Sequence, residues 1–393
     1  MLRAYSGRRY GRVSLVAAMV VGVFVTAQEA EAIPYFARKH NLRCTTCHVL
    51  PPKLNTFGEE FLARGYRLSR EQAGPVTGTV PFAAWISGRY EENFSKDFGE
   101  VFLNKVELIS GGPIGDLPLT YFVEWRLVSL ETRNDGSLRD RSGRFEDIFV
   151  NIEIDERNTF TIGQYRALEQ VDVSRRLSPS EPALFSTSLA GSPAASQRIQ
   201  SLRAFSPSGR SPGFTYELQS ILGERASDGL FHAVTVPFPG EISIPLTPEA
   251  QDEASFELEG KPKGVFLETF YRQSLNSVGV HAFIGSGRWQ VQGVGTLNYK
   301  EFYATGGVGV DERDGTTRVR YSVEAEYVPI FSDVFRPALG FRVEQITNAD
   351  REPAFIPYVA LSGPNTSFTF LLNIQYRAQK DDDALVIELG TVF

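Results

Sequence analysis

Most of this chain alternates between apolar and polar residues, and that alternation limits its fold more than any other feature. It fills segments of about ten residues from about Val80 to Phe393, separated by glycine-rich and polar stretches. Successive side chains of a β-strand point to opposite faces, so each segment predicts a strand with one apolar and one polar face. Clear examples are the segments 119–128, 146–154, 278–284, 319–323 and 385–389.

Charged residues in the middle of these segments indicate what the polar face meets. The examples are Lys105, Glu107, Glu124, Arg126, Arg320 and Glu324. Such residues are costly in the core of a β-sandwich, but they suit a water-filled lumen whose outer face meets lipid. The pattern therefore predicts an all-β outer-membrane β-barrel of about 16 antiparallel strands. A soluble periplasmic β-sandwich or propeller is the alternative, although no blade-length repeat favours the propeller.

The expected connections between the strands are of two kinds. Short turns are predicted at 111–116 and 155–158, and longer polar loops at 91–99, 130–144 and 167–195. Short turns at one end and long loops at the other are typical of bacterial barrels. The chain also ends on a strand with Phe393, as do many bacterial outer-membrane barrels that it resembles.

The only two cysteines stand in the motif Cys44-Thr45-Thr46-Cys47-His48. At this spacing two thiols can form thioether bonds to the vinyl groups of one haem, and the histidine that follows can bind its iron. The motif therefore predicts one covalently bound haem c.

Three other uses of a CxxC pair are less consistent with the sequence. A thioredoxin-like redox pair needs a βαβ context, which residues 33–75 do not show. A structural disulfide across two residues closes little loop and is strained. A zinc site needs two further ligands at matched spacing, and no second Cys or His pair follows.

The first 32 residues have the three parts of a secretory signal peptide. Arginines make the positive region, residues 13–27 are apolar, and Ala30-Glu31-Ala32 is a small-residue cleavage site. The mature chain is then expected to start at Ile33. Arg8-Arg9 also allows a twin-arginine signal, but its flanking residues fit poorly.

Charge and hydropathy exclude two classes of protein. The chain has a net charge of −7 and no basic stripe, so a nucleic-acid partner is not expected. After the signal, no stretch approaches about 18 apolar residues, which excludes a helical membrane protein.

The segment 33–75 is too small for an ordinary free-standing cytochrome, because chains of roughly 40 residues need a metal, a covalent cofactor or a partner to stay folded. Pro51-Pro52 are expected to open a helix, and Gly65 to end it. The apolar face of this helix is Leu54, Phe57, Phe61 and Leu62, which predicts packing against haem and helix.

The sixth ligand of the haem iron has several candidates. Both methionines, Met1 and Met19, lie in the signal peptide, so His/Met ligation within the mature chain is excluded. His40 and His281 are the possible distal ligands, the latter because alternation places it on the lumen face. The facing of His232 is ambiguous. An open sixth position would instead allow ligand binding.

The N-terminal residues resemble a known family. The matching stretches are Ile33-Pro34-Tyr35-Phe36-Ala37-Arg38, the CTTCH motif at 44–48, Pro52-Lys53-Leu54-Asn55-Thr56-Phe57-Gly58, Phe61 and Gly65-Tyr66. Over about residues 33–68 the chain resembles the fused cytochrome–porin proteins of bacterial outer membranes, whose best-known members oxidise extracellular ferrous iron. Over the barrel the resemblance is architectural.

This resemblance implies that Cys44 and Cys47 attach the haem and that His48 is its proximal ligand. It also implies a small α-helical c-type haem domain that plugs the barrel, in its lumen or at its periplasmic mouth. The expected division of the chain is a signal peptide at 1–32, a monohaem cytochrome c-like domain at 33–75 and a transmembrane β-barrel at 76–393.

The expected function is electron transfer across the outer membrane of a Gram-negative bacterium. The apolar band of such a membrane is about 25 Å tall, so a single haem suits this task only if it sits within the lumen. Extracellular Fe(II) is the expected donor, or another electron donor, and the acceptor is a periplasmic carrier such as a soluble cytochrome c. The alternatives are a diffusion porin with a haem-bearing plug or redox gate, and a haem-based sensor or enzyme.

Two acidic segments could in principle bind a cation. They are Asp381-Asp382-Asp383, expected in an outer loop between the last two strands, and the segment with Glu249, Asp252, Glu253 and Glu257. Hard oxygen ligands bind Fe(II) weakly, and solvated loop charges are the simpler interpretation. Neither segment is assigned as a metal site.

Overall fold

The computed structural model describes most of the chain beyond the predicted signal peptide. The described residues are 35–40, 42–68, 82–132, 138–140, 142–166, 177, 210–220, 222–223, 225–238, 264–285, 288–313, 315–332, 335–347, 352–364, 369–380 and 382–392. The predicted signal peptide, the predicted domain boundary at 75/76, the acidic residues 249–257, Asp381 and Phe393 lie outside them.

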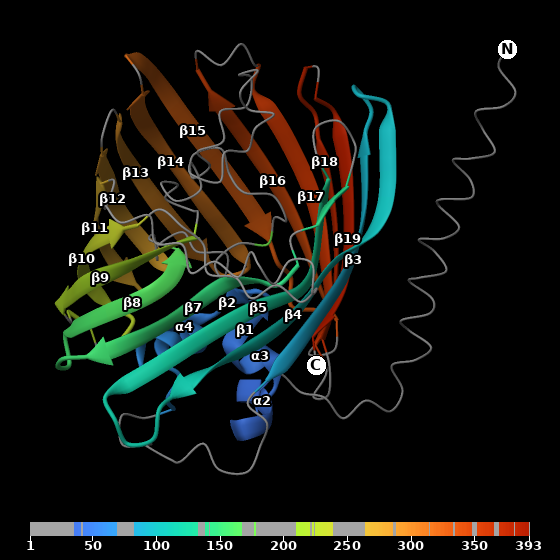
Figure 1. Ribbon diagram of the computed structural model, residues 1–393. Coiled ribbons are helices and arrows are strands. Elements are labelled where there is room, and N and C mark those ends of the chain that lie inside the picture. Colours follow the sequence, from blue (N-terminus) through green and yellow to red (C-terminus); the bar gives the residue numbers. More distant parts are fainter. Residues whose placement is uncertain are drawn as a thin grey trace, which may run out of the picture.

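Sixteen antiparallel strands of the described residues close into a barrel (Figure 1). Each strand pairs with its neighbours in the chain, and the last pairs with the first, β19 with β3. The predicted all-β barrel of about 16 strands is thereby confirmed. The strands are β3 (Ala83–Asn93), β4 (Phe98–Pro113), β5 (Leu119–Thr132), β7 (Arg144–Glu153), β8 (Asn158–Arg166), β9 (Arg210–Ser220), β10 (Gly229–Pro237), β11 (Gly264–Gln273), β12 (Asn276–Gly285), β13 (Arg288–Tyr299), β14 (Phe302–Arg313), β15 (Thr316–Tyr327), β16 (Arg336–Ile346), β17 (Ala354–Pro364), β18 (Thr369–Arg377) and β19 (Ala384–Val392), and the short β6 (Leu138–Asp140) adds to the far end of β5.

Alternation along β12 shows how each strand divides its residues between two environments. Val278, Val280 and Ile284 point outward and are 64%, 54% and 60% exposed. His281 and Phe283, which alternate with them, are each 2% exposed in the lumen. The period of two in the sequence therefore separates a lipid-compatible face from an inner face.

The inner face carries the charged residues, as the sequence predicted. Arg320 is buried and donates from Nε and Nη2 to Asp311 at 2.7 and 3.0 Å. Buried Glu107 accepts from Arg126 at 2.8 Å and pairs with Lys105 at 2.7 Å. Burying these charges is tolerable because each has a partner of opposite sign.

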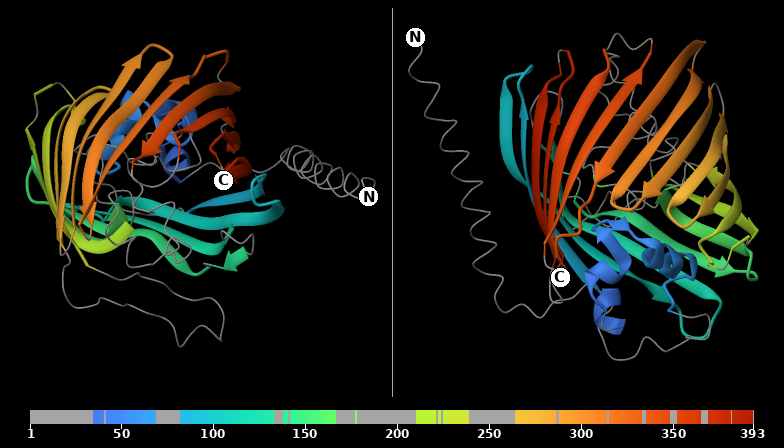
Figure 2. Two further views of the ribbon diagram at one scale, coloured as in Figure 1. Left: turned by 90° about the horizontal axis from the view of Figure 1, so that it is seen from above. Right: turned by 180° about the vertical axis from the view of Figure 1, so that it is seen from behind.

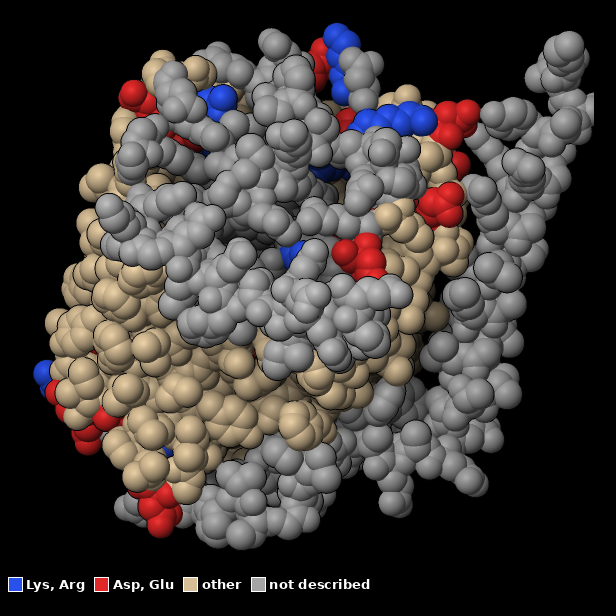
Figure 3. All heavy atoms as spheres, viewed as in Figure 1, with Lys and Arg blue, Asp and Glu red and all other residues tan. Residues whose placement is uncertain are grey.

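The outer face is apolar and is bordered by aromatic residues near both ends of the barrel. In Figure 3 the tan wall at the left and bottom shows few charged atoms, and the visible Asp and Glu atoms lie at its lower edge and around the upper rim. The exposed aromatic residues are Tyr299, Phe302, Tyr327, Phe331 and Phe335 near one end and Phe94, Trp289, Phe355 and Tyr376 near the other. An apolar band between two aromatic girdles is the surface expected of a membrane barrel.

The two ends of the barrel differ in their connections. We call one end the turn end; it holds the connections 114–118, 154–157, 221–228, 274–275, 300–301, 328–335 and 365–368, none longer than eight residues. We call the other end the loop end; it holds the short connections 94–97, 286–287 and 314–315 and the longer ones 133–143, 167–209, 238–263, 347–353 and 378–383. Bacterial barrels place short turns in the periplasm and long loops outside the cell.

Several predicted connections are shorter than the sequence suggested, because strand pairing continues into them. The predicted loop 91–99 shrinks to 94–97, since Asn93 pairs with Phe98 and its Oδ1 accepts the Lys96 N–H at 2.9 Å. The turn predicted at 111–116 lies instead at 114–118, because β4 extends to Pro113. The predicted loop 130–144 contains β6, and the loop 167–195 is described only at Leu177.

A small unit formed by residues 35–68 occupies the turn end of the barrel (Figures 1 and 2). We call it the plug. It contains the helices α2 (Tyr35–His40), α3 (Cys44–Cys47) and α4 (Thr56–Ala63), and a hairpin of β1 (His48–Leu50) and β2 (Lys53–Leu54).

The helix predicted to follow Pro51-Pro52 starts later than expected. Residues 53–54 pair with β1 instead, and α4 begins after Asn55, whose Oδ1 accepts the Gly58 N–H at 3.0 Å and caps the helix. The C-terminal prediction holds, because Gly65 adopts a φ of +62° just beyond the helix. Phe61 is buried, but Phe57 is 42% exposed and does not belong to the packed face.

Among the described residues, no helix has the length and apolarity needed to cross a membrane.

Candidate functional site

The CxxC motif forms a single helical turn, α3, that presents both cysteines from one short segment. Both are free thiols, with Cys44 buried and Cys47 partly buried. Burial raises the pKa of both thiols, and the neighbouring Cys44 adds to the shift that takes Cys47 to about 11. Both sulfurs are therefore protonated near neutral pH, and a protonated thiol is less reactive than a thiolate.

His48 follows the turn directly and has one ring nitrogen already engaged. Its Nδ1 donates to the carbonyl of Pro52 at 3.0 Å, and its backbone N–H donates to the carbonyl of Cys44. Burial lowers the pKa of His48, so the ring is neutral near pH 7. With the proton on Nδ1, the lone pair lies on Nε2. Metal-binding histidines usually donate the other ring N–H to a carbonyl in this way, so the residue fits an axial iron ligand.

Asn55 and Gly58 hold helix α4 against the CxxC turn. The Asn55 amide donates to the carbonyls of Thr45 and Thr46 at 3.2 and 3.0 Å, and its backbone N–H donates to Cys47 at 2.9 Å. A Cβ at Gly58 would lie 2.2 Å from the Cys47 carbonyl oxygen, so only glycine fits there. The turn that carries the cysteines is therefore fixed by three backbone contacts from the following segment.

The three histidines considered for the sixth position of the iron lie in different surroundings. His40 ends α2 within the plug, and its ring centroid is 5.9 Å from that of Phe61. His281 is buried in the wall of the lumen, where its Nδ1 is 3.3 Å from Glu268. His232 alternates with the buried Phe231 and faces outward, so it does not serve the plug.

The plug and His281 are separated along the barrel wall. Glu268 pairs with His281 across β11 and β12, and it lies four residues beyond Arg272, which contacts the plug. That spacing corresponds to about 13 Å along the strand. His40 shares the plug with the CxxCH motif, whereas His281 belongs to the wall.

Charged contacts on one side lock the plug hairpin to the wall formed by β14–β17. Lys53 forms an ion pair with Glu326, and its Nζ lies 4.4 Å from the ring centre of Tyr303. Arg336 donates to the carbonyls of Val49 and His48 at 2.7 and 3.2 Å. The barrel therefore binds the backbone of His48, the proposed iron ligand, through a direct hydrogen bond.

Further polar contacts surround the plug. Glu59 pairs with Arg272 at 3.3 Å, and both side chains are buried. Arg67 forms an ion pair with Glu153 at the turn end. Cys44 Sγ lies 2.9 Å from the hydroxyl of Thr369 in β18. These contacts reach strands on several sides of the lumen, so the plug has one orientation in the barrel.

An apolar cluster joins the tip of the plug hairpin to the lumen. Leu50 is fully buried and packs with Val328, Ala338, Tyr358 and other apolar residues of the wall. Leu177 joins the same cluster, although it belongs to the long connection at the loop end. Its N–H donates to Glu326 at 3.2 Å. Leu177, a residue of the loop-end connection, therefore packs in the same apolar cluster as the tip of the plug hairpin.

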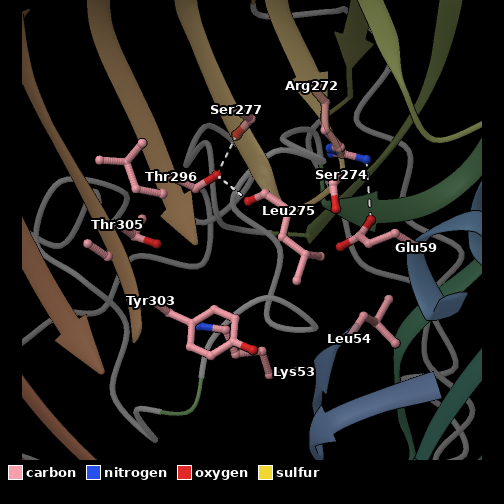
Figure 4. Close-up of a pocket in the computed structure, with 12 residues that line it drawn as sticks. Lys53, Leu54, Glu59, Arg272, Ser274, Leu275, Ser277, Thr296, Tyr303 and Thr305 are labelled. Atoms are coloured by element: carbon pink, nitrogen blue, oxygen red, sulfur yellow. Dashed lines mark hydrogen bonds and ion pairs between the residues drawn. The ribbon is translucent and has the colours of Figure 1, made fainter. Parts of the chain in front are cut away.

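A small hollow remains between the plug and the wall formed by β11–β14 (Figure 4). The empty volume here is about 430 Å³ when the open space at its mouth is counted. Hydroxyl groups from Ser277 and Thr296 line one side, and Tyr303 and the Glu59–Arg272 pair line the others. Leu54, Leu275 and Leu297 line it as well, so the lining is both polar and apolar.

Basic residues pair with two groups of carboxylates, one in the lumen and one in the predicted outer loop. Carboxylate oxygens of Glu107, Glu124 and Glu146 lie within 4.8 Å of one another in the lumen. Arg126 forms ion pairs with two of them, Glu107 and Glu146, which offsets their charge. In the predicted outer acidic segment, Asp382 pairs with Lys96 at 3.2 Å, in keeping with ordinary loop charges.

Sequence reasoning did not find the barrel residues that hold the plug. Glu326, Arg336, Arg272 and Thr369 stand in alternating strands where polar residues are expected in every second position. Their alternation predicts that they face the lumen. No local signal indicates which of them meets a plug residue hundreds of positions away.

Comparisons with known proteins agree on the barrel. No family model and no curated protein matches the chain. Among solved structures, OmpF of Salmonella typhi, in complex with daunomycin, is 12% identical, covers 79% of this chain and 97% of its own, and has a TM-score of 0.50. OprB of Pseudomonas putida is 9% identical, covers 79% of this chain and 94% of its own, and also has a TM-score of 0.50. The chain therefore has the fold of outer-membrane porins.

Proposed function

We propose that this protein transfers single electrons across an outer membrane through one haem c held by its plug. The observation that carries the proposal is the CxxCH turn wedged into the turn end of a closed barrel. Cys44 and Cys47 offer two thiols for attachment, and His48 presents Nε2 because its Nδ1 is bound to Pro52. A haem attached there would supply a one-electron iron couple. His40 is the preferred second ligand and His281 the alternative.

The membrane assignment rests on the surface and the fold. The outer face is apolar between two sets of exposed aromatic residues, and the fold is that of outer-membrane porins. We assign the protein to the outer membrane of a Gram-negative bacterium, with lipid around β3–β19. The turn end then faces the periplasm, and the plug enters the lumen from that side.

The proposed partners follow from this orientation. A donor outside the cell, for which we propose Fe(II), delivers electrons from the loop end. A soluble periplasmic carrier, such as a cytochrome c, accepts them at the turn end, where the plug lies. The residues of the chain hold and orient the iron site. They need no acid or base, because a single electron transfer makes and breaks no bond.

Anaerobic stopped-flow absorbance tests this function. The oxidised protein in detergent is mixed with Fe(II) near neutral pH, and the reduced haem band is followed. We expect the band to appear rapidly in the wild type. A Cys44→Ser/Cys47→Ser variant, which loses both attachment points, is expected to lack it. A wild-type haem that dithionite reduces but Fe(II) does not would contradict the choice of Fe(II) as donor.

A passive channel is the second candidate, because the barrel fold is shared with porins. The plug contacts weigh against an open pore, since Lys53–Glu326 and Glu59–Arg272 pin it on two sides. Solute flux into liposomes that contain the protein separates the candidates. Flux that matches an open porin, and that the Cys44→Ser/Cys47→Ser variant retains, would favour the channel. CO binding to the reduced protein would instead indicate an open sixth position and a sensor or enzyme.

A further inference from the structure

Aromatic rings form an unbroken series from the plug to the wall of the barrel. Within the plug, the ring centroids of Phe36 and Phe61 are 5.2 Å apart, and those of Phe36 and Tyr66 are 5.0 Å apart. Tyr66 stacks on Phe122 of β5 at 5.9 Å. The series therefore leaves the plug through Tyr66. At its other end, Phe61 contacts the ring of His40, a candidate iron ligand.

The series continues along the inner face of the wall. Phe122 stacks on Phe149 of β7 at 5.7 Å, and Phe149 meets Tyr165 of β8 edge-on at 5.7 Å. We call His40, Phe61, Phe36, Tyr66, Phe122, Phe149 and Tyr165 the aromatic series. The Tyr165 hydroxyl shares a hydrogen bond of 2.6 Å with Thr215, which fixes the last ring.

The wall part of the series rises only a short way before it ends beside the loop end of β8. Phe122 pairs with Phe149, and Phe149 pairs with Gly163, so these three residues lie at one level of the wall. Tyr165 lies two residues beyond Gly163, about 7 Å along the strand, and one residue before Arg166, the last residue of β8. The rings therefore join the plug to the loop-end edge of β8.

Two glycines of the wall make room for the rings. A Cβ at Gly111 would lie 2.9 Å from Phe122 and 3.3 Å from Phe36. A Cβ at Gly163 would lie 2.8 Å from the Cβ of Phe149. The plug is held by its ion pairs and by the contact of Tyr66 with Phe122. Phe149 and Tyr165 continue the series along the wall beyond Phe122.

We propose that the aromatic series couples the plug to a one-electron donor at the loop end, an inference that rests on the proposed haem function. One electron leaves an Fe(II) donor, which becomes Fe(III), and arrives at the iron of the plug, which passes from ferric to ferrous. No bond forms or breaks. The rings keep their protons and are not oxidised themselves. Their contacts shorten the steps through empty space that the electron would otherwise have to cross.

The test uses outer-membrane vesicles from an expression host, which keep the loop end outward. The donor is an Fe(II) chelate bound to a polymer too large to enter the lumen, and the readout is the rate at which the haem band appears. In Phe149→Leu we expect this rate to fall by on the order of tenfold. The midpoint potential of the haem, from an equilibrium titration, should stay unchanged, because Phe149 lies outside the plug.

The matched control is Phe283→Leu. Phe283 is also buried in the lumen and paired with a ring, Phe266, at 4.6 Å, but it lies outside the aromatic series. Its rate should stay near the wild-type value. If Phe149→Leu fails to assemble, as judged by heat-dependent gel mobility of the barrel, Tyr165→Leu replaces it.

The outcomes separate the two proposals. A wild-type protein without a haem band overturns the proposed function and, with it, this inference. Haem that is present and reducible by dithionite, with equal reduction rates in wild type and Phe149→Leu, overturns the aromatic series alone. Equal slowing in Phe149→Leu and Phe283→Leu also overturns it, because the effect would then come from general loosening of the lumen.

Discussion

The plug meets two unlike walls of the same lumen. On the side of β14–β17 the contacts are charged and directional, with Lys53 paired to Glu326 and Arg336 bound to two plug carbonyls. On the side of β4–β8 the contacts are mainly aromatic, with Tyr66 stacked on Phe122, and one ion pair joins Arg67 to Glu153 at the turn end. Both walls come from strands with the same alternating pattern.

The difference shows how one pattern can serve two purposes. Ion pairs fix distance and direction, so the charged wall sets the depth and rotation of the plug. Stacked rings tolerate small shifts and contribute less free energy, so the aromatic wall adds little to orientation. The plug therefore gains its position from one wall, and the proposed path for electrons from the other. The predictions below test this division.

The largest loss of stability is expected at the charged wall. Glu326→Gln leaves the buried Lys53 ammonium without an opposite charge, and we expect a loss of about 3–5 kcal/mol. The measurement is the denaturant concentration at which trypsin first cleaves the plug in lipid-embedded protein. The double variant Lys53→Met/Glu326→Gln should recover most of the loss, because no unpaired charge remains. A single variant as stable as the wild type would show that this ion pair does not hold the plug.

A smaller loss is expected at the apolar tip of the plug, which packs on the same side of the lumen as the charged wall. Leu50 is fully buried against the lumen cluster, so Leu50→Ala should cost about 3 kcal/mol. The same protease assay measures it. Phe57→Ala, at an exposed position of the same plug, is the control and should change little. Equal effects of the two substitutions would contradict the buried position of Leu50.

The aromatic wall should stabilise the plug less than the Lys53–Glu326 ion pair or the buried Leu50 does. Phe122→Leu keeps an apolar side chain and removes one stacking contact with the plug, so we expect a loss of about 1 kcal/mol. Protease sensitivity of the plug reports the stability, and the vesicle assay reports the electron transfer. A large loss of stability, comparable with that of Glu326→Gln, would erase the proposed difference between the walls.

The smallest effect is expected outside the lumen. Lys380 and Glu352 form an ion pair at 3.5 Å at the loop end, with both side chains 65% exposed. Lys380→Ala should change the stability by less than about 0.5 kcal/mol, because water screens such pairs. Denaturant titration of the barrel measures it. A loss of stability as large as that of Glu326→Gln would show that exposed ion pairs and buried ion pairs contribute equally in this protein.

The barrel was predictable because its signal repeats. Alternation over many segments indicated the strands, and charges such as Arg320 in mid-strand indicated the lumen. The ends of the strands were less predictable. Asn93 and Pro113 continue the ladder into segments that look like loops, because pairing with the neighbouring strand decides where a strand ends.

The candidate site was predictable only in part. Local spacing identified Cys44, Cys47 and His48, and their use in haem attachment stays a prediction. The predicted start of α4 was wrong, because Leu54 pairs with His48 across the hairpin instead of joining the helix. The contacts of Arg336 and Thr369 with the plug depend on packing between distant parts of the chain, which local pattern does not encode.

One measurement tests the central claim most directly. The full chain, expressed in a host that attaches c-type haem, is denatured in detergent, and its mass and absorbance are recorded together. The account predicts a polypeptide that keeps one haem after denaturation, and a Cys44→Ser/Cys47→Ser variant that keeps none. A denatured wild-type chain with two free thiols and no haem absorbance would contradict it and leave a plugged porin-like barrel.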